Sequence, residues 1–389
     1  RALLITGLTL GSSLEHAAVF EREAVAADHA EASKAGAEIL AAGGNAADAA
    51  AATMLALGVV NPASSGLGGG GFALYYRAKD RSLTFLDFRE RAPKAATRTM
   101  FEAEGERPPG PASSLSQLGG LAAGVPGEPA GIEAMVRRFG RLSLREVVAP
   151  ALRLAEDGFT VSEALAKMGK AFGAQLARDP VMSQWSLEAG ATLKRPVLAR
   201  VLRAFAEKGA AVIYGGVIGE EIAAAVQAQG GIMTLQDLRS YRVRTREPLE
   251  TDAFGYRWVT APPPSAGGFT MIQSLSILEA AVGRTPSRGE ALLHAMAESW
   301  KGPFLDRQRY FGDPDQEILP LAEMMTAARL AKRAALASDD QAHPASDYDC
   351  PGQWTRTQVS APDTAGTSHL CVVDSAGNVA AVTTTVNLP

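Results

Sequence analysis

The sequence is poor in several features that would tie it to a specialised class of protein. It has only two cysteines in 389 residues, Cys350 and Cys371, which excludes a disulfide scaffold and favours free, buried thiols. Its 38 Lys and Arg nearly balance its 42 Asp and Glu, so it has no basic footprint for nucleic acid. The longest apolar stretch, residues 46–60, is interrupted by Asp48 and is too short to cross a membrane. An ordinary globular composition remains, long enough for one large domain or two.

Common catalytic and binding motifs are also missing. The five histidines form no His-x-x-x-His pair, which argues against a zinc site. Neither Gly-x-Ser-x-Gly nor Ser-x-x-Lys occurs, which argues against the common serine hydrolases. The glycine run at residues 66–71 is followed by Phe72 and lacks the Lys-Ser/Thr of a phosphate loop. We therefore interpret this run as a tight turn that allows close backbone packing, and we predict no metal and no cofactor.

What the sequence does contain is a predicted β-hairpin at its C-terminal end. Residues 372–373 and 379–386 are rich in β-branched and apolar side chains, and a short Ser/Gly/Asn cluster separates them. A three-residue loop over residues 375–377, with Gly377 at positive φ, would be a type I turn with a glycine bulge.

The length of this loop decides which side chains face each other. A three-residue loop pairs Asp374 with Asn378 and places Thr367 opposite Thr385, with Cβ atoms about 5 Å apart. A two-residue loop would put the two threonines on opposite faces of the hairpin. On periodicity alone, both threonines could simply be good strand residues.

The rest of the chain predicts a helix-rich protein with strands near both ends. Asn45 is a good candidate for the N-cap of a buried, alanine-rich helix. The predicted elements are helices over 28–41 and 45–58, a hairpin over 68–77 and 82–88, a mostly helical segment over 128–230, strands over 249–261, helices over 269–278 and 289–310, and loops over 107–114 and 338–362.

The C-terminal segment Thr-Ser-His-x-x-Val-Val-Asp-x-x-Gly-Asn, followed by Thr-x-Thr-x-Asn, resembles the maturation and nucleophile segment of the γ-glutamyltranspeptidases. These enzymes belong to the N-terminal-nucleophile hydrolase superfamily. Further motifs similar to theirs occur in the family's order over about residues 25–389: residues 38–49, 65–72, 87–93, 125–127, 230–238, 261–268 and 306–314.

This resemblance implies a fold and a maturation step. The fold would be α+β, an αββα sandwich with a large helical middle segment. The family's members are precursors that cut themselves, here at the Gly366–Thr367 bond, into two subunits that remain together as a heterodimer. Residues 25–366 would belong to the large subunit and residues 367–389 would begin the small one, whose remainder lies beyond residue 389.

Residues 1–24 allow two interpretations. Their apolar segment could be the remnant of a signal-peptide core, with a small-residue cut near Ala17-Ala18, or the start of an ordinary buried strand or helix. Resemblance to the family, which implies a periplasmic or extracellular enzyme in bacteria, favours the signal peptide.

The resemblance also implies roles for particular residues. Thr367 would be the nucleophile, and its freed α-amine the base, because an α-amino pKa of about 7.7–8 lies near working pH. Thr385 would orient Thr367. The Arg89 guanidinium would grip the donor's α-carboxylate in a bidentate pair. Asn387, expected on the same strand face as Thr385, would contact the donor's amino end. His369 also shares the strand face of Thr367, where we expect it to support the site rather than act as base.

The implied activity is γ-glutamyl transfer from glutathione or a related γ-glutamyl amide to water, an amino acid or a peptide, through a γ-glutamyl ester on Thr367. Such an enzyme is a γ-glutamyltransferase or glutathione hydrolase. Two alternatives use the same scaffold: a glutaryl-type β-lactam acylase and a poly-γ-glutamate transpeptidase. A third is an unprocessed, non-catalytic binding protein. Residues 1–389 alone are expected to be inactive, because further donor ligands of the family lie beyond them.

Overall fold

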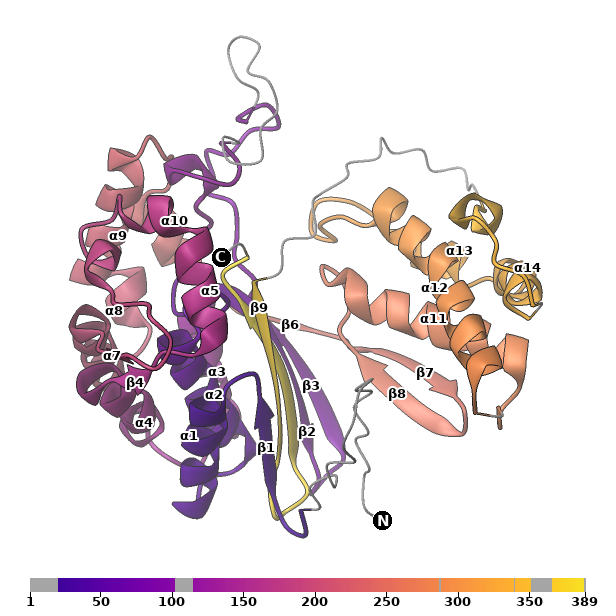
Figure 1. The fold of residues 1–389 in the computed structure, drawn as a ribbon, viewed down its shortest axis with the longest axis horizontal. Helices are drawn as coiled ribbons and strands as arrows, with labels where there is room; N and C mark the ends of the chain where they lie inside the picture. Colours follow the sequence, from indigo (N-terminus) through magenta and orange to yellow (C-terminus); the bar gives the residue numbers. More distant parts are fainter. Residues whose placement is uncertain (1–19, 102–114, 287, 339, 351–365, 388–389) are drawn as a thin grey trace. The chain divides into compact units, whose positions relative to one another are not determined.

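The C-terminal hairpin lies in the middle of a six-stranded sheet (Figure 1). The fold is that of a computed structural model, which describes residues 20–101, 115–286, 288–338, 340–350 and 366–387. Two compact units are present, residues 1–245 with 364–389 and residues 246–363. In sheet order, the strands are β1 (Ala24–Ala27), β9 (Thr367–Val373), β10 (Val379–Thr385), β2 (Gly70–Arg77), β3 (Ser82–Asp87) and β6 (Arg244–Arg246).

Strand alternation gives the sheet one buried and one more open face. In β9, Ser368, Leu370 and Val372 are buried, whereas Thr367 and His369 on the other face are exposed. The buried face packs against α2 (Ala46–Val60), all of whose residues are buried. Figure 1 shows the helices of this unit gathered on one side of the sheet. Thr367 and His369 therefore lie on the face of the sheet that these helices leave open.

The predicted turn of the hairpin is confirmed. Gly377 has a φ of 81°, and the Asp374 amide donates to the Asn378 carbonyl at 3.1 Å. The Asp374 carboxylate accepts from the amides of Ala376 and Asn378 within the turn, and from the amide of Ala46 at the start of α2. One buried carboxylate thus fixes the turn and ties it to the helix beneath the sheet.

The helical character predicted for residues 128–230 is confirmed, as is the capping role of Asn45, whose side chain accepts from the amides of Ala47 and Asp48. The remaining elements of this unit are α1 (Ala30–Ala41), η1 (Gly120–Ala122), α3 (Glu128–Phe139), α4 (Leu144–Asp157), β4 (Phe159–Thr160), α5 (Glu163–Ala171), α6 (Gly173–Leu176), η2 (Met182–Gln184), β5 (Thr192–Leu193), α7 (Pro196–Lys208), α8 (Ala211–Tyr214), α9 (Val217–Ala228) and α10 (Leu235–Ser240).

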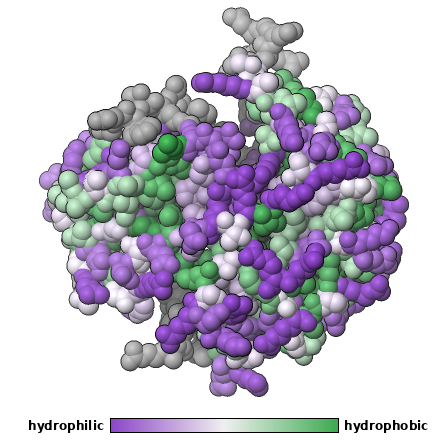
Figure 2. Space-filling model, turned by 180° about the vertical axis from the view of Figure 1, so that it is seen from behind, coloured by the Kyte–Doolittle hydropathy of each residue, from purple (hydrophilic) through white to green (hydrophobic). Residues whose placement is uncertain are grey.

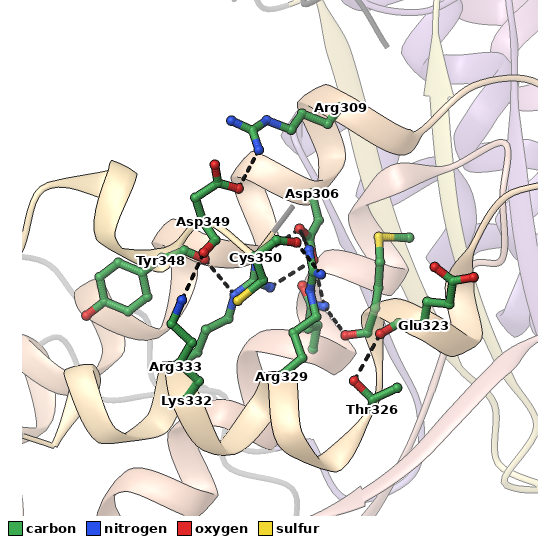
Figure 3. A network of polar contacts seen from close by, with 12 residues as sticks. Asp306, Arg309, Glu323, Thr326, Arg329, Lys332, Arg333, Tyr348, Asp349 and Cys350 are labelled. Carbon is green, nitrogen blue, oxygen red and sulfur yellow. Dashed lines mark hydrogen bonds and ion pairs between the residues drawn. The ribbon is translucent and has the colours of Figure 1, made fainter. Parts of the chain in front are cut away.

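The second unit is built around a buried ion-pair network (Figure 3). Arg333 is fully buried and donates to both oxygens of Asp306 at 2.8 and 2.9 Å, while Arg329 pairs with the same carboxylate. Burial alone would raise the pKa of Asp306, but hydrogen bonds from Arg333 and Arg329, helped by their charges, hold it below its usual value. The elements of this unit are β7 (Leu249–Ala253), β8 (Tyr256–Thr260), α11 (Ala266–Val282), α12 (Glu290–Tyr310), α13 (Leu321–Met324), α14 (Ala327–Ala337) and η3 (Ala345–Tyr348).

The same network also holds the backbone of residues 348–350. The carbonyls of Tyr348, Asp349 and Cys350 accept hydrogen bonds from Arg333, Lys332 and Arg329, respectively. Three successive carbonyls are thereby held by three cationic side chains of α14.

Some expectations need correction. The predicted loop over residues 338–362 contains η3, a short 3₁₀ helix. Residues 351–362 of this loop, and the whole predicted loop over 107–114, lie outside the described part of the chain. Both cysteines are free, as predicted, but they are half-buried rather than buried. The signal-peptide interpretation falls on residues 1–19, which the structure does not describe.

Hydrophobic and hydrophilic residues are interspersed on the surface, as expected from the balanced composition. Figure 2 shows hydrophobic patches interrupted by hydrophilic side chains over the face in view. Within the described ranges, no helix has both the length and the apolar character needed to cross a membrane.

The buried pair generates a stability prediction. Arg333→Met should lower the free energy of unfolding of the second unit by about 3–5 kcal/mol, because it leaves Asp306 buried without its bidentate partner. Thermal and urea unfolding monitored by circular dichroism would measure the loss. The matched control is Arg257→Met, which breaks the pair with Glu250 on exposed side chains and should cost about 0–1 kcal/mol. Equal losses in the two variants would contradict the structural role of Arg333.

Candidate active site

The two hairpin threonines meet as the predicted register requires. Thr385 is the cross-strand partner of Thr367, and the Thr367 hydroxyl donates to the Thr385 hydroxyl at 3.1 Å. The Thr385 hydroxyl in turn donates to the carbonyl of Gly366 at 2.7 Å. The Thr367 hydroxyl is therefore connected, through the Thr385 hydroxyl, to the carbonyl of the residue immediately before it.

Arg89 lies in the same row of the sheet. Thr385 pairs with Gly70 of β2, and reciprocal backbone hydrogen bonds between Gly71 and Phe88 extend the β2–β3 ladder one pair past Asp87. The next pair in this register is Gly70 with Arg89. Since neighbouring strands are about 4.8 Å apart, the Cα atoms of Arg89 and Thr367 are separated by about 14 Å across three strand spacings.

The Arg89 side chain is held on the open face but remains 41% exposed. Its guanidinium lies over the Phe72 ring, 5.8 Å from the centroid, and its Nε is 3.5 Å from a carboxylate oxygen of Glu90. Its backbone is fixed twice, because its amide donates to Asp87 at 3.0 Å and its carbonyl accepts from the Tyr241 hydroxyl at 2.8 Å. Arg89 therefore has a backbone held in place and a guanidinium that solvent and ligands can reach, as a carboxylate-binding residue needs.

A second row on the open face contains His369. Its Nδ1 is 2.8 Å from the Thr383 hydroxyl, and its Nε2 is 3.4 Å from the sulfur of Cys371. Burial lowers the pKa of His369 although the nearby Asp28 carboxylate opposes the shift, and burial raises the pKa of the Cys371 thiol. Both ring nitrogens of His369 thus contact side chains on the same face of the sheet, and its supporting role stays a prediction.

Asn387 departs from the predicted geometry. We expected it to continue the face of Thr385 along the strand, but β10 ends at Thr385 and Asn387 has a φ of 75°. The chain turns there, and the Asn387 amide donates to the Thr385 hydroxyl at 2.8 Å. Asn387 therefore joins the site through its backbone, and strand alternation does not place its side chain.

Glycines allow the backbone to close around the two threonines. A Cβ on Gly69 would lie 2.0 Å from the Thr385 carbonyl oxygen, and one on Gly70 would lie 2.9 Å from the Glu90 carboxylate. The Gly69 carbonyl also accepts from the amides of Gly127 and Glu128 at the start of α3. The glycine-rich run thus acts as the predicted close-packing turn, and it joins β10 to a helix N-terminus.

Glu128 is a site component that sequence reasoning missed. Its side chain is buried beneath the sheet and accepts a hydrogen bond from Thr384, the residue next to Thr385. Burial raises the pKa of Glu128 to about 8, against a smaller opposing effect of the Thr384 hydrogen bond. The only signal in the sequence was its place directly after the Val-Pro-Gly motif at residues 125–127.

Comparisons with known proteins agree with this geometry. A family model described as Gamma-glutamyltranspeptidase matches residues 32–389. The chain is 37% identical over 378 residues to Glutathione hydrolase 3 of Arabidopsis thaliana, covering 94% of this chain and 56% of the relative. It is 38% identical over 372 residues to the Glutathione hydrolase proenzyme of Escherichia coli (strain K12), covering 93% and 62%. The chain thus spans less than two thirds of the length of these relatives.

Solved structures are similar over most of the chain. A Helicobacter pylori gamma-glutamyltranspeptidase aligns with a TM-score of 0.76 at 33% identity, over 88% of this chain and 96% of that chain. A cephalosporin acylase from Bacillus halodurans aligns with a TM-score of 0.76 at 25% identity, over 98% and 70%. These neighbours confirm the predicted α+β N-terminal-nucleophile hydrolase fold, to which the described residues contribute the six-stranded sheet and the helices packed against one of its faces.

The close approach at Gly69 can be tested by adding one methyl group. Gly69→Ala should destabilise the protein by about 1–3 kcal/mol, because the new Cβ overlaps the Thr385 carbonyl and the backbone must move. Thermal unfolding would report it as a lowered midpoint. Gly68→Ala is the matched control, since a Cβ there meets nothing within 4 Å. If both variants melt alike, the packing of the glycine run against β10 is not as described.

Proposed function

Because the chain belongs to the γ-glutamyltranspeptidase family, we propose that it is part of a precursor that cuts itself before Thr367 and then transfers γ-glutamyl groups. The observation that carries the proposal is the hydrogen-bonded set of Thr367, Thr385 and the Gly366 carbonyl. In this proposal, residues 25–366 form the large subunit and residues 367–389 begin the small one.

In the first step, the Thr367 hydroxyl oxygen attacks the carbonyl carbon of Gly366. The hydrogen bond from Thr385 to the carbonyl oxygen stabilises the negative charge that develops there. The Gly366–Thr367 C–N bond then breaks, the hydroxyl proton passes to the leaving amine, and an ester joins Gly366 to the Thr367 oxygen. Water hydrolyses this ester, which frees both the hydroxyl and the α-amine of Thr367.

In the second step, the freed amine of Thr367 serves as the base for its own hydroxyl, since an α-amino pKa lies near neutral pH. The hydroxyl attacks the donor's γ-carbonyl, the donor's amine leaves with a proton, and a γ-glutamyl ester forms on Thr367. Water, an amino acid or a peptide then takes up the γ-glutamyl group. Glutathione, a γ-glutamyl amide, is the donor we propose.

The spacing of Arg89 suits this donor. The α-carboxylate and γ-carbonyl carbons of an extended γ-glutamyl group are about 5 Å apart. An extended arginine side chain and a threonine hydroxyl supply the rest of the separation of about 14 Å between the two Cα atoms. Gly70, which lies between them in the row, has no side chain of its own to fill this space. Asn387 would contact the donor's amino end.

A second candidate activity is hydrolysis of an acyl amide of the cephalosporin type, supported by the structural similarity to a cephalosporin acylase. The Thr367 chemistry would be the same, and the pocket around Arg89 would differ. A poly-γ-glutamate transpeptidase would likewise keep the threonine. A purified precursor assayed with glutathione, a glutaryl amide and poly-γ-glutamate would rank these donors.

We also propose that the protein acts outside the cytoplasm. The apolar segment at residues 2–11 supports export to the periplasm or the extracellular space. Extracellular γ-glutamyl amides would then be the accessible donors.

Self-cleavage predicts two fragments. Intact mass spectrometry of the full-length gene product should show a split between Gly366 and Thr367, whereas Thr367→Ala should remain one chain because it has no nucleophile. Thr367→Ser should still be cut, because it keeps a hydroxyl at the same position. A wild-type protein that is folded and uncut would remove the catalytic proposal and leave the unprocessed binding protein in its place.

Replacing Arg89 should weaken donor binding. Arg89→Lys should raise KM for glutathione about tenfold or more, because an ammonium cannot form the bidentate pair with a carboxylate. Cleavage at Gly366–Thr367 should continue, since Arg89 does not contact either residue in this mechanism. Steady-state kinetics of the processed variant would measure KM. An unchanged KM with a reduced kcat would show that Arg89 does not hold the donor's carboxylate.

A further inference from the structure

We propose that Glu128 is a positioning residue for the proposed self-cleavage: its buried carboxyl group holds Thr385 against the Gly366 carbonyl by anchoring Thr384 from beneath the sheet. This inference rests on the proposed function. The Glu128 carboxyl lies on the opposite side of the sheet from Thr367, and it takes no part in the reaction steps proposed above.

The connection is short and continuous. Thr384 is fully buried and faces the helices, whereas its neighbour Thr385 faces the open side. The Thr384 hydroxyl donates to one carboxyl oxygen of Glu128, and the Glu128 amide donates to the Gly69 carbonyl at 3.0 Å. Gly69 in turn packs against the Thr385 carbonyl. The first residue of α3 therefore holds the end of β10 both through a side chain and through the glycine run.

The surroundings of Glu128 favour its neutral form. It is 1% exposed, and its second carboxyl oxygen is buried without a hydrogen-bond partner. The helix N-terminus favours a carboxylate, but this effect is small beside the cost of burying an unpaired charge. Thus burial outweighs the helix dipole, in agreement with a Glu128 pKa of about 8.

Within the part of the chain that the structure describes, no cationic side chain contributes to the pKa shift of Glu128. Tyr214 of α8 is the titratable neighbour that Glu128 influences electrostatically, and Tyr241 stacks on Tyr214 with ring centroids 5.5 Å apart. Burial raises the pKa of both phenols well above their usual range. Glu133, five residues further along α3, also raises the pKa of Tyr214. From β10, the facing group is the uncharged Thr384.

The sign of the pH effect follows from this. Because burial raises the pKa of Glu128 above its unfolded value, the stability that it contributes is present below that unfolded value and is lost as pH rises towards and through about 8. Above this pH, an ionised Glu128 would draw water or shift away from its partners, and the end of β10 would move with it. Self-cleavage should therefore weaken above pH 8 for a reason that is separate from the nucleophile.

The test compares Glu128→Gln with wild type in the full-length gene product. Glutamine keeps the shape and the acceptor oxygen but cannot ionise. The rate of cleavage at Gly366–Thr367, followed by intact mass from pH 6 to 10, should be nearly equal for the two proteins at pH 6. The ratio of the variant's rate to the wild-type rate should rise to about tenfold at pH 9, one unit above a pKa of about 8. A merely structural role would not change the shape of the profile.

A second pair of variants tests the connection itself. Thr384→Val removes the hydroxyl and should slow cleavage even at pH 6, whereas Thr384→Ser should restore it. These variants also decide the matter if Glu128→Gln does not fold, which circular dichroism would show. Identical pH profiles for wild type and Glu128→Gln, or wild-type rates in Thr384→Val, would overturn the inference while cleavage itself continued. A folded wild type that is never cut would overturn the proposed function instead, and the positioning role with it.

Discussion

The pairing of β9 with β10 is the constraint on which the site depends. A change of one residue in that register would move Thr367 and Thr385 to opposite faces of the sheet. The register is set at the turn, where Gly377 adopts a positive φ and the Asp374 carboxylate accepts hydrogen bonds from the loop and from α2. A buried carboxylate at the far end of the hairpin from Thr367 thereby decides whether the two hydroxyl groups can meet.

The two faces of this sheet have different surroundings, and successive side chains of β10 point to one face and then the other. Val382 and Thr384 face the helices, whereas Thr383 and Thr385 face the open side. Neighbouring residues of β10 thus pack in the core on one face and line the candidate site on the other. The glycine run makes this possible, because its lack of side chains lets Gly69 approach the backbone of Thr385 directly, while the Gly69 carbonyl accepts hydrogen bonds from the start of α3.

The second unit holds residues 348–350 through their backbone. The cations of α14 bind these three successive carbonyls, and Asp306 pairs with Arg333, so this stretch is anchored by charge-assisted hydrogen bonds rather than by apolar packing alone. An arginine that is fully buried is tolerated there because its guanidinium is matched to a carboxylate and a carbonyl.

The sequence by itself determined the local features of this protein. The hairpin, its three-residue turn, the cap at Asn45, the helical middle and the pairing of Thr367 with Thr385 all follow from short-range patterns, because turn chemistry and side-chain alternation act over a few residues. Tertiary structure decided what joins distant segments. Arg89 enters the row of the threonines only through the β2–β10 pairing. Asn387 leaves the strand because the chain turns after Thr385. Glu128 becomes a buried neutral acid because α3 packs under Thr384, more than 250 residues away in sequence. Burial and pairing across such separations depend on the whole packed core, and no local pattern contains them.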